Sequence, residues 1–129
     1  MDTSPGVPPI DQQVKRDVGA DAEMTSWGSV QWAVREGDPP GAEQTFAIAV
    51  FDAGEGNVEH THPNCEEIVY VIEGEIEHTL GDERTRLGPG DLIVVPRDVP
   101  HRLVNTSGAP TRAIIVFSSP DRQFVPTDG

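Results

Sequence analysis

Two histidines stand one residue apart in the stretch HTHPNCEEIVYVIEG, which covers residues 60–74. On a β-strand, side chains at positions i and i+2 project from the same face, so His60 and His62 would point the same way, about 7 Å apart along the backbone. Imidazole nitrogen is a good ligand for first-row divalent metals, and a carboxylate beside two histidines forms the open arrangement of non-haem iron sites. Glu66 or Glu67 can supply that oxygen. The stretch therefore predicts a metal site that needs one more ligand.

A third histidine is the natural candidate for that ligand. His101 opens the segment HRLVN directly after the turn-rich PRDVP. A strand that enters the same barrel at this point can aim the imidazole inward. The sequence thus predicts that two distant segments meet at one site.

The segments that must position these residues are short and β-like. They show period-two or continuous apolar character and are separated by turns rich in glycine, proline or aspartate. The expected strands cover residues 29–34, 45–51, 57–62, 67–72, 75–80, 84–87, 91–96, 101–105 and 111–117. Strands at this spacing predict an all-β antiparallel sandwich or barrel, and no window has the length and period of a helix.

The chain is expected to hold one folded domain. Residues 1–22 are rich in proline, aspartate and glutamine without periodicity, which predicts a flexible N-terminal arm, and residues 23–129 form the β-barrel domain. Several strands, such as EIVYVI at 67–72, are apolar on both faces, so the outer face of the barrel also needs cover. We therefore expect a homodimer.

Charge and composition exclude several classes of partner. Acidic residues outnumber basic ones 22 to 9, for a formal charge of −13, so the chain lacks the cationic surface that nucleic acids and anionic membranes require. The single cysteine, Cys65, cannot form an intramolecular disulfide, and it is read as a small buried hydrophobe rather than a metal ligand. No signal peptide or membrane span is recognisable. We expect a soluble, cytoplasmic protein whose partner is a small molecule.

Two spaced motifs resemble those of the cupin superfamily. They read Gly54-x5-His60-x-His62-x4-Glu67-x6-Gly74 and Gly90-x5-Pro96-x-Asp98-x2-His101-x3-Asn105. The one departure is Asp98, where the family usually has glycine, and aspartate can adopt the same left-handed dihedral angles. The resemblance implies a small jelly-roll β-barrel, open at one end. It also implies one metal held by His60, His62, Glu67 and His101.

The resemblance implies a function class rather than a single reaction. Three imidazoles and one carboxylate suit iron, manganese or nickel, with zinc as a further option. We expect a metal-dependent enzyme that acts on a small, oxygen-rich molecule bound to the metal. Iron(II) dioxygenation is placed first, and isomerase, lyase or decarboxylase chemistry on a small acid or sugar is placed second. A non-catalytic module that binds or senses a small ligand is the alternative from another class, and a zinc-stabilised structural barrel is a third reading.

Five further side chains are weaker candidates for contact with a substrate. Gln31, His78 and Arg112 each have the chemistry to bind a carboxylate or hydroxyl, although each is also explained as a strand residue that is packed or exposed. Trp27 and Trp32 have the chemistry to stack on an aromatic ligand, although tryptophans in such a strand more often pack in a core or dimer interface.

Overall fold

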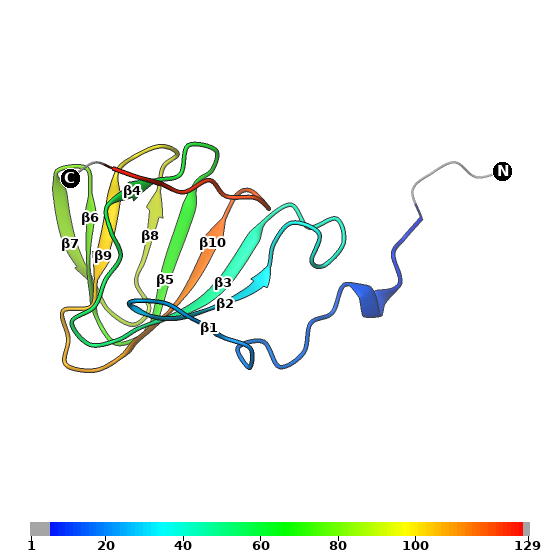
Figure 1. The fold of residues 1–129 in the computed structure, drawn as a ribbon, viewed down its shortest axis with the longest axis horizontal. Helices are drawn as coiled ribbons and strands as arrows, with labels where there is room; N and C mark the ends of the chain where they lie inside the picture. Colours follow the sequence, from blue (N-terminus) through cyan, green and yellow to red (C-terminus); the bar gives the residue numbers. More distant parts are fainter. Residues whose placement is uncertain (1–5, 128–129) are drawn as a thin grey trace.

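The structure, a computed structural model, describes residues 6–127, which form two antiparallel sheets facing each other (Figure 1). One sheet has the strand order β1 (Glu23–Met24), β2 (Gly28–Val34), β3 (Thr45–Phe51), β10 (Thr111–Phe117), β5 (Glu67–Glu73) and β8 (Leu92–Val95). The other has the order β11 (Val125–Pro126), β4 (His60–Thr61), β9 (His101–Val104), β6 (Ile76–Leu80) and β7 (Glu83–Leu87). The prediction of an all-β antiparallel barrel is confirmed, and the structure divides it into two sheets.

Strands β3 and β10 show why the apolar runs between turns were informative. Both have the predicted bounds, and they pair along their full length, from Thr45 with Phe117 to Phe51 with Thr111. In each strand, residues alternate between buried and partly exposed positions. Because successive side chains point to opposite faces, every second residue of these strands enters the barrel.

One expected strand is much shorter in the structure. The pattern over residues 57–62 predicted six strand residues, but β4 contains only His60 and Thr61. Before it, the Asn57 side chain takes the place of a ladder partner, because its Oδ1 accepts a hydrogen bond from the backbone N–H of Leu103 at 3.0 Å. The two-residue strands β1 and β11 and a short 3-10 turn at Ile10–Gln12 were not predicted.

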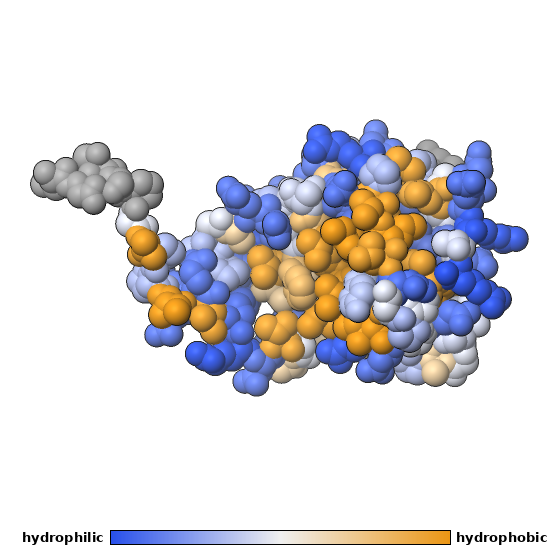
Figure 2. Space-filling model, turned by 180° about the vertical axis from the view of Figure 1, so that it is seen from behind, coloured by the Kyte–Doolittle hydropathy of each residue, from blue (hydrophilic) through white to orange (hydrophobic). Residues whose placement is uncertain are grey.

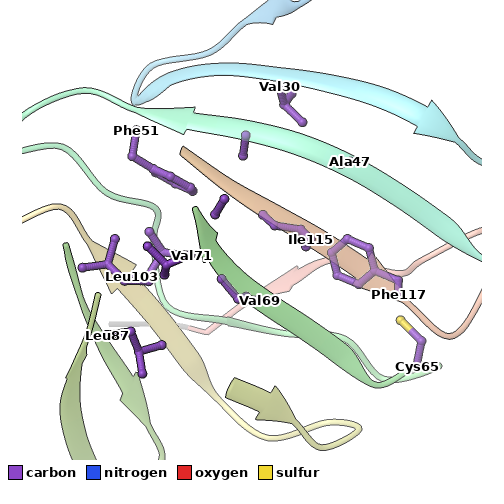
Figure 3. Packing of buried hydrophobic residues seen from close by; sticks show 13 residues of the cluster. Val30, Ala47, Phe51, Cys65, Val69, Val71, Leu87, Leu103, Ile115 and Phe117 are labelled. Carbon is purple, nitrogen blue, oxygen red and sulfur yellow. The ribbon is translucent and has the colours of Figure 1, made fainter. Parts of the chain in front are cut away.

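The hydrophobic core lies between the two sheets (Figure 3). Val69 and Val71 of β5 are fully buried and face Leu103 from the opposite sheet, while Phe51 and Ile115 fill the space beside them. Burial of each such side chain stabilises the fold by roughly 1.5–3 kcal/mol. The core therefore does not depend on the histidines for its cohesion.

The outer side of the six-stranded sheet is also apolar. Figure 2 shows a broad hydrophobic patch on this side of the molecule. We call this surface the outer apolar face; its side chains are Phe46, Ile48, Val50, Ile68, Tyr70, Ile72, Leu92, Val94, Ile114 and Val116. Leu92 and Val94 remain 54% and 44% exposed, which is unusual for neighbouring apolar residues on one strand.

The N-terminal segment from residue 6 to residue 22 extends away from the sheets (Figure 1). It is tethered near its middle, where Lys15 Nζ lies 2.8 Å from Asp38 Oδ2 and Gln13 donates a hydrogen bond to the Pro40 carbonyl. Residues 1–5 of the predicted arm, and residues 128–129 of the predicted barrel domain, lie outside the described part of the chain. Within residues 6–127, no helix is long and apolar enough to cross a bilayer.

Candidate metal centre

The three motif histidines and Glu67 come from both sheets and meet inside the barrel. His60 on β4 lies directly opposite His101 on β9 in the strand ladder, and His62 follows immediately after β4. Glu67 is the first residue of β5 in the other sheet. The two distant motifs therefore converge on one point between the sheets.

At this point the four side chains lie close together and are buried. The ligand-type nitrogens of His60, His62 and His101 all lie within 4.8 Å of one another. Glu67 Oε1 lies 3.0 Å from His101 Nε2 and 3.9 Å from His62 Nε2. None of the four residues is more than 6% exposed.

Backbone carbonyl groups fix the orientation of each of these imidazoles. His60 Nδ1 donates to the Val58 carbonyl at 2.6 Å, and His101 Nδ1 donates to the Val99 carbonyl at 2.9 Å. His62 Nδ1 donates to the Gln123 carbonyl at 2.7 Å, across 61 residues of sequence. A carbonyl can only accept, so Nδ1 carries a proton, and in the neutral ring Nε2 keeps its lone pair. Partners of this kind orient the histidines of metal sites.

The side chains at the cluster fit a divalent cation, because two of their buried nitrogens lack a hydrogen-bond partner within residues 6–127. His62 Nε2 and His101 Nε2 are buried and lack a hydrogen-bond partner with acceptable geometry among the described residues. A buried polar atom without a partner is costly, and a cation at the centre of the cluster would satisfy both nitrogens. Burial lowers the pKa of His60 to about 4 and also lowers the pKa of His62, so both rings are neutral at pH 7, as ligands must be.

Glu67 and His101 are electrostatically coupled. Burial acts to raise the pKa of the Glu67 carboxyl, but His101 and the other histidines outweigh it and the pKa is lowered. Burial acts to lower the pKa of His101, but the Glu67 carboxylate outweighs it and the pKa is raised. Glu67 is thus ionised inside the barrel, whereas Glu66 is exposed. Of the two carboxylates left open by the sequence, the buried one lies at the cluster.

The other motif residues shape the turns around the site. Gly74 has a φ of 83°, and a Cβ there would collide with Thr111 of β10. Asp98 has a φ of 62°, the left-handed conformation expected of it. Asn105 is fully buried and donates hydrogen bonds to the carbonyls of Phe51 and Ala109.

A cavity of about 430 Å³ opens beside the cluster. His60, His62 and Glu67 line it on one side. Most of the remaining wall is apolar, and it includes five of the seven aromatic residues of the chain: Trp27, Trp32, Phe51, Phe117 and Phe124. The centre therefore faces a space of the size and character of a small-molecule site.

Some of the weaker candidates for substrate contact line the cavity and others do not. Gln31 and Arg112 do not line this cavity; both lie at strand positions that alternate with the inward-facing residues. Trp27 and Trp32 do line it. Cys65 is buried in the hydrophobic core and is not part of the histidine cluster.

The segment after β10 was not predicted to be part of the site. Gln123 supplies the carbonyl that orients His62, and the Phe124 ring stacks on His60 with a centroid distance of 4.4 Å. Arg122, the residue before Gln123, also lines the cavity. The segment has no period-two pattern, and the role of a backbone carbonyl cannot be recognised from residue types. In the sequence, only the closeness of Arg122 to Phe124 hinted at a binding role for this segment.

His78 is more deeply buried than the sequence suggested. It is 1% exposed, and its ring lies parallel to that of His101 at 6.0 Å. Neither ring nitrogen has a hydrogen-bond partner with acceptable geometry among the described residues, and His78 does not line the cavity. Burial lowers its pKa to about 4.

The buried state of His78 predicts an acid-labile fold. Between about pH 6.5 and 4 the unfolded chain binds a proton at His78 that the folded chain does not, so this residue removes stability as the pH falls. In metal-free protein, His78→Leu should reduce the loss between pH 7 and pH 5 by up to about 2 kcal/mol. Denaturant unfolding at both pH values measures this, with Glu77→Gln on the same strand as control. Equal acid losses in His78→Leu and wild type would contradict the assignment.

Comparisons with known proteins agree with this architecture. The family model described as "Cupin domain" matches residues 47–117. SchB from Streptomyces halstedii is 40% identical over 75 residues, which are 57% of this chain and 54% of that protein. Polyketide synthase CurC from Streptomyces cyaneus is 35% identical over 79 residues, which are 60% of this chain and 51% of that protein. The chain spans little more than half the length of the curated relatives it matches.

Among solved structures, an oxalate oxidase superposes with a TM-score of 0.77 at 21% identity, covering 91% of this chain and 64% of that one. At this identity the likeness concerns the fold. A two-sheet β-barrel with a buried histidine cluster that fits a metal defines the class of protein. The chain belongs to the cupin family.

Proposed function

We propose that His60, His62, Glu67 and His101 hold one divalent transition metal, and that the protein is an enzyme acting on a small, oxygen-rich molecule bound at that metal. The observation that carries the proposal is the orientation of the three imidazoles. Each Nδ1 donates to a backbone carbonyl, so in the neutral ring the lone pair available to a metal is that of Nε2. The lowered pKa of the Glu67 carboxyl keeps a negative charge beside them.

The protein would contribute the positions of the four ligands, the negative charge of Glu67 and a mostly apolar cavity beside them. A bound divalent metal would act as a Lewis acid towards substrate oxygens or a bound water. The neutral imidazoles and the single carboxylate would leave the centre with one net positive charge, which suits an anionic oxygen donor. The cavity walls beside the centre are mostly apolar. Iron, manganese and nickel remain the preferred metals, and zinc a further option.

Dioxygenation on iron(II) is the first reaction to test, with isomerase, lyase or decarboxylase chemistry second. The name of CurC as a polyketide synthase supports including β-diketones among the substrates tested. Protein reconstituted with iron, manganese, nickel or zinc is incubated with β-diketones, flavonols, keto acids and uronates while oxygen uptake and products are recorded. We expect turnover of at least one compound with one metal.

Two other results would redirect the proposal. Tight binding without chemistry for every compound would favour a ligand-binding or sensing module. Unfolding on chelation would favour a structural zinc site, since a structural metal contributes directly to folding. The apolar core between the sheets predicts instead that the metal-free barrel stays folded.

We also propose that the outer apolar face pairs two copies of the chain in a homodimer. Tyr70 and Leu92, neighbours on β5 and on the edge strand β8, remain 39% and 54% exposed on this face. A partner that buries them removes these apolar side chains from water. Light scattering should therefore give the mass of a dimer.

A charge on this face should dissociate the dimer. Ile114→Glu places a carboxylate among apolar neighbours on β10, and we expect the mass to fall to that of one chain at micromolar concentration. Arg84→Glu, on β7 of the other sheet, is the matched control and should leave the mass unchanged. A wild-type protein that is monomeric at all concentrations would refute the dimer.

A further inference from the structure

The guanidinium group of Arg122 sits among three aromatic rings at the wall of the cavity. Its Cζ atom lies 4.6 Å from the ring centroid of Trp32, 5.2 Å from that of Phe117 and 5.5 Å from that of Phe124. Cations are attracted to the faces of aromatic rings, so the three rings fix the position of this charge. The guanidinium is therefore held in position by contacts with the barrel and does not extend freely into solvent.

Arg122 nevertheless lacks a polar partner. No hydrogen bond or ion pair connects its side chain to any residue between 6 and 127, although other arginines, such as Arg86 with Glu75, are paired. The guanidinium has five N–H donors, and aromatic faces offer them no oxygen. Burial lowers the pKa of Arg122, but an arginine stays charged at any physiological pH. A partly buried cation with free donors is poised to bind an anion.

The position of Arg122 relates it to the metal centre. It lines the same cavity as His62 and Glu67, and it is the one basic side chain other than histidine among the described residues in that lining. The chain as a whole carries a formal charge of −13, which repels anions from most of its surface. Glu23 and Glu67 carry negative charge in the same lining, so Arg122 is the side chain of the cavity that favours an anionic ligand.

The rest of the wall indicates the shape of the ligand. Trp27 stacks on Phe51 with a centroid distance of 4.3 Å, and these rings line the cavity together with the rings around Arg122. Flat apolar surfaces bind flat apolar molecules through stacking and burial. The volume of about 430 Å³ has room for a ligand of about two fused rings.

We infer that Arg122 is the anion-recognition group of the cavity and that the ligand is a small organic acid with a flat, apolar body. Its carboxylate binds the guanidinium, and a second oxygen lies towards the histidines. The second contact rests on the proposed metal function, whereas the first requires Arg122 alone. The two are tested separately below.

The test uses two probes of the same size and shape, the anionic 6-hydroxy-2-naphthoate and the neutral 6-hydroxy-2-naphthamide. Calorimetric titration gives their affinities for metal-free protein and for protein loaded with Mn²⁺. We expect wild type to bind the acid at least about tenfold more tightly than the amide in both states, since charge-assisted bonds are the stronger ones. Arg122→Met should bring the ratio close to one, and Arg122→Lys should leave an intermediate ratio. Arg112→Met, on the outer side of β10, is the matched control and should keep the wild-type ratio.

The ratio separates recognition from a merely structural role. If Arg122 only held the segment after β10 against the barrel, Arg122→Met would weaken acid and amide alike and leave the ratio unchanged, which would overturn the inference. Wild type that binds neither probe, or that does not distinguish them, would also overturn it. Failure of the proposed metal site would appear differently, as protein that retains no Mn²⁺ while the acid-to-amide ratio of the metal-free form still depends on Arg122.

Discussion

Protein with His60→Ala or His101→Ala is expected to bind a divalent metal more than about 100-fold more weakly than wild type. Changes to groups that merely orient a ligand cost about 10–100-fold in affinity, and loss of a ligand itself should cost more. The two residues face each other across β4 and β9, so each removal opens the same cluster. Elemental analysis after dialysis against Mn²⁺ or Fe²⁺ and gel filtration measures the occupancy.

The fold should survive both changes. The core residues Val69, Val71 and Leu103 pack without contribution from the metal, so the circular dichroism spectrum should keep its β-sheet character. His78→Asn is the matched control, because it alters a buried histidine that lies outside the cluster. Full occupancy in either alanine variant would refute the ligand assignment.

Glu67→Gln is expected to weaken metal binding by at least about tenfold, whereas Glu66→Gln should change it less than about twofold. The substitution keeps the size of the side chain and removes the buried charge that lies 3.0 Å from His101 Nε2. Glu66 is exposed, so its charge is screened by solvent. Competition with a chromophoric chelator measures both affinities on the same scale.

The metal-free forms provide a second readout for Glu67. The raised pKa of His101 means that this histidine adds stability below its unfolded pKa of about 6.5 and that the contribution is lost as the pH rises through the folded value. Glu67→Gln removes the main cause of that raised pKa, so a titration of His101 by NMR should shift downward. Equal effects of Glu66→Gln and Glu67→Gln on affinity would show that the wrong carboxylate was chosen.

Sequence periodicity was a reliable guide where one face of a strand is buried. The bounds of β3 and β10 follow from two nearly continuous apolar runs that end at turn residues, and strand geometry then makes successive side chains alternate between the core and the outer face. The same rule placed Glu67, Val69 and Val71 on one side of β5, and all three are buried. Alternation also argues against Arg112, whose neighbours Thr111 and Ala113 are the inward residues.

Periodicity could not locate the parts of the site that depend on irregular backbone. The stretch 57–59 has the pattern of a strand, but the Asn57 side chain accepts the hydrogen bond from the Leu103 N–H. The strand β4 starts only at His60. The segment after β10 returns to the cluster through single contacts, such as the Gln123 carbonyl at His62. Contacts of this kind depend on the path of the chain in space rather than on residue type, so Arg122 became visible as a cavity residue only in the structure.

A crystal grown with Mn²⁺ and measured for anomalous scattering tests the central claim most directly. We predict one strong peak inside the barrel, within about 2.0–2.4 Å of the Nε2 atoms of His60, His62 and His101 and of a carboxylate oxygen of Glu67. A barrel without a peak, or a peak bound only by acidic residues on the surface, would contradict the metal centre and with it the proposed enzyme.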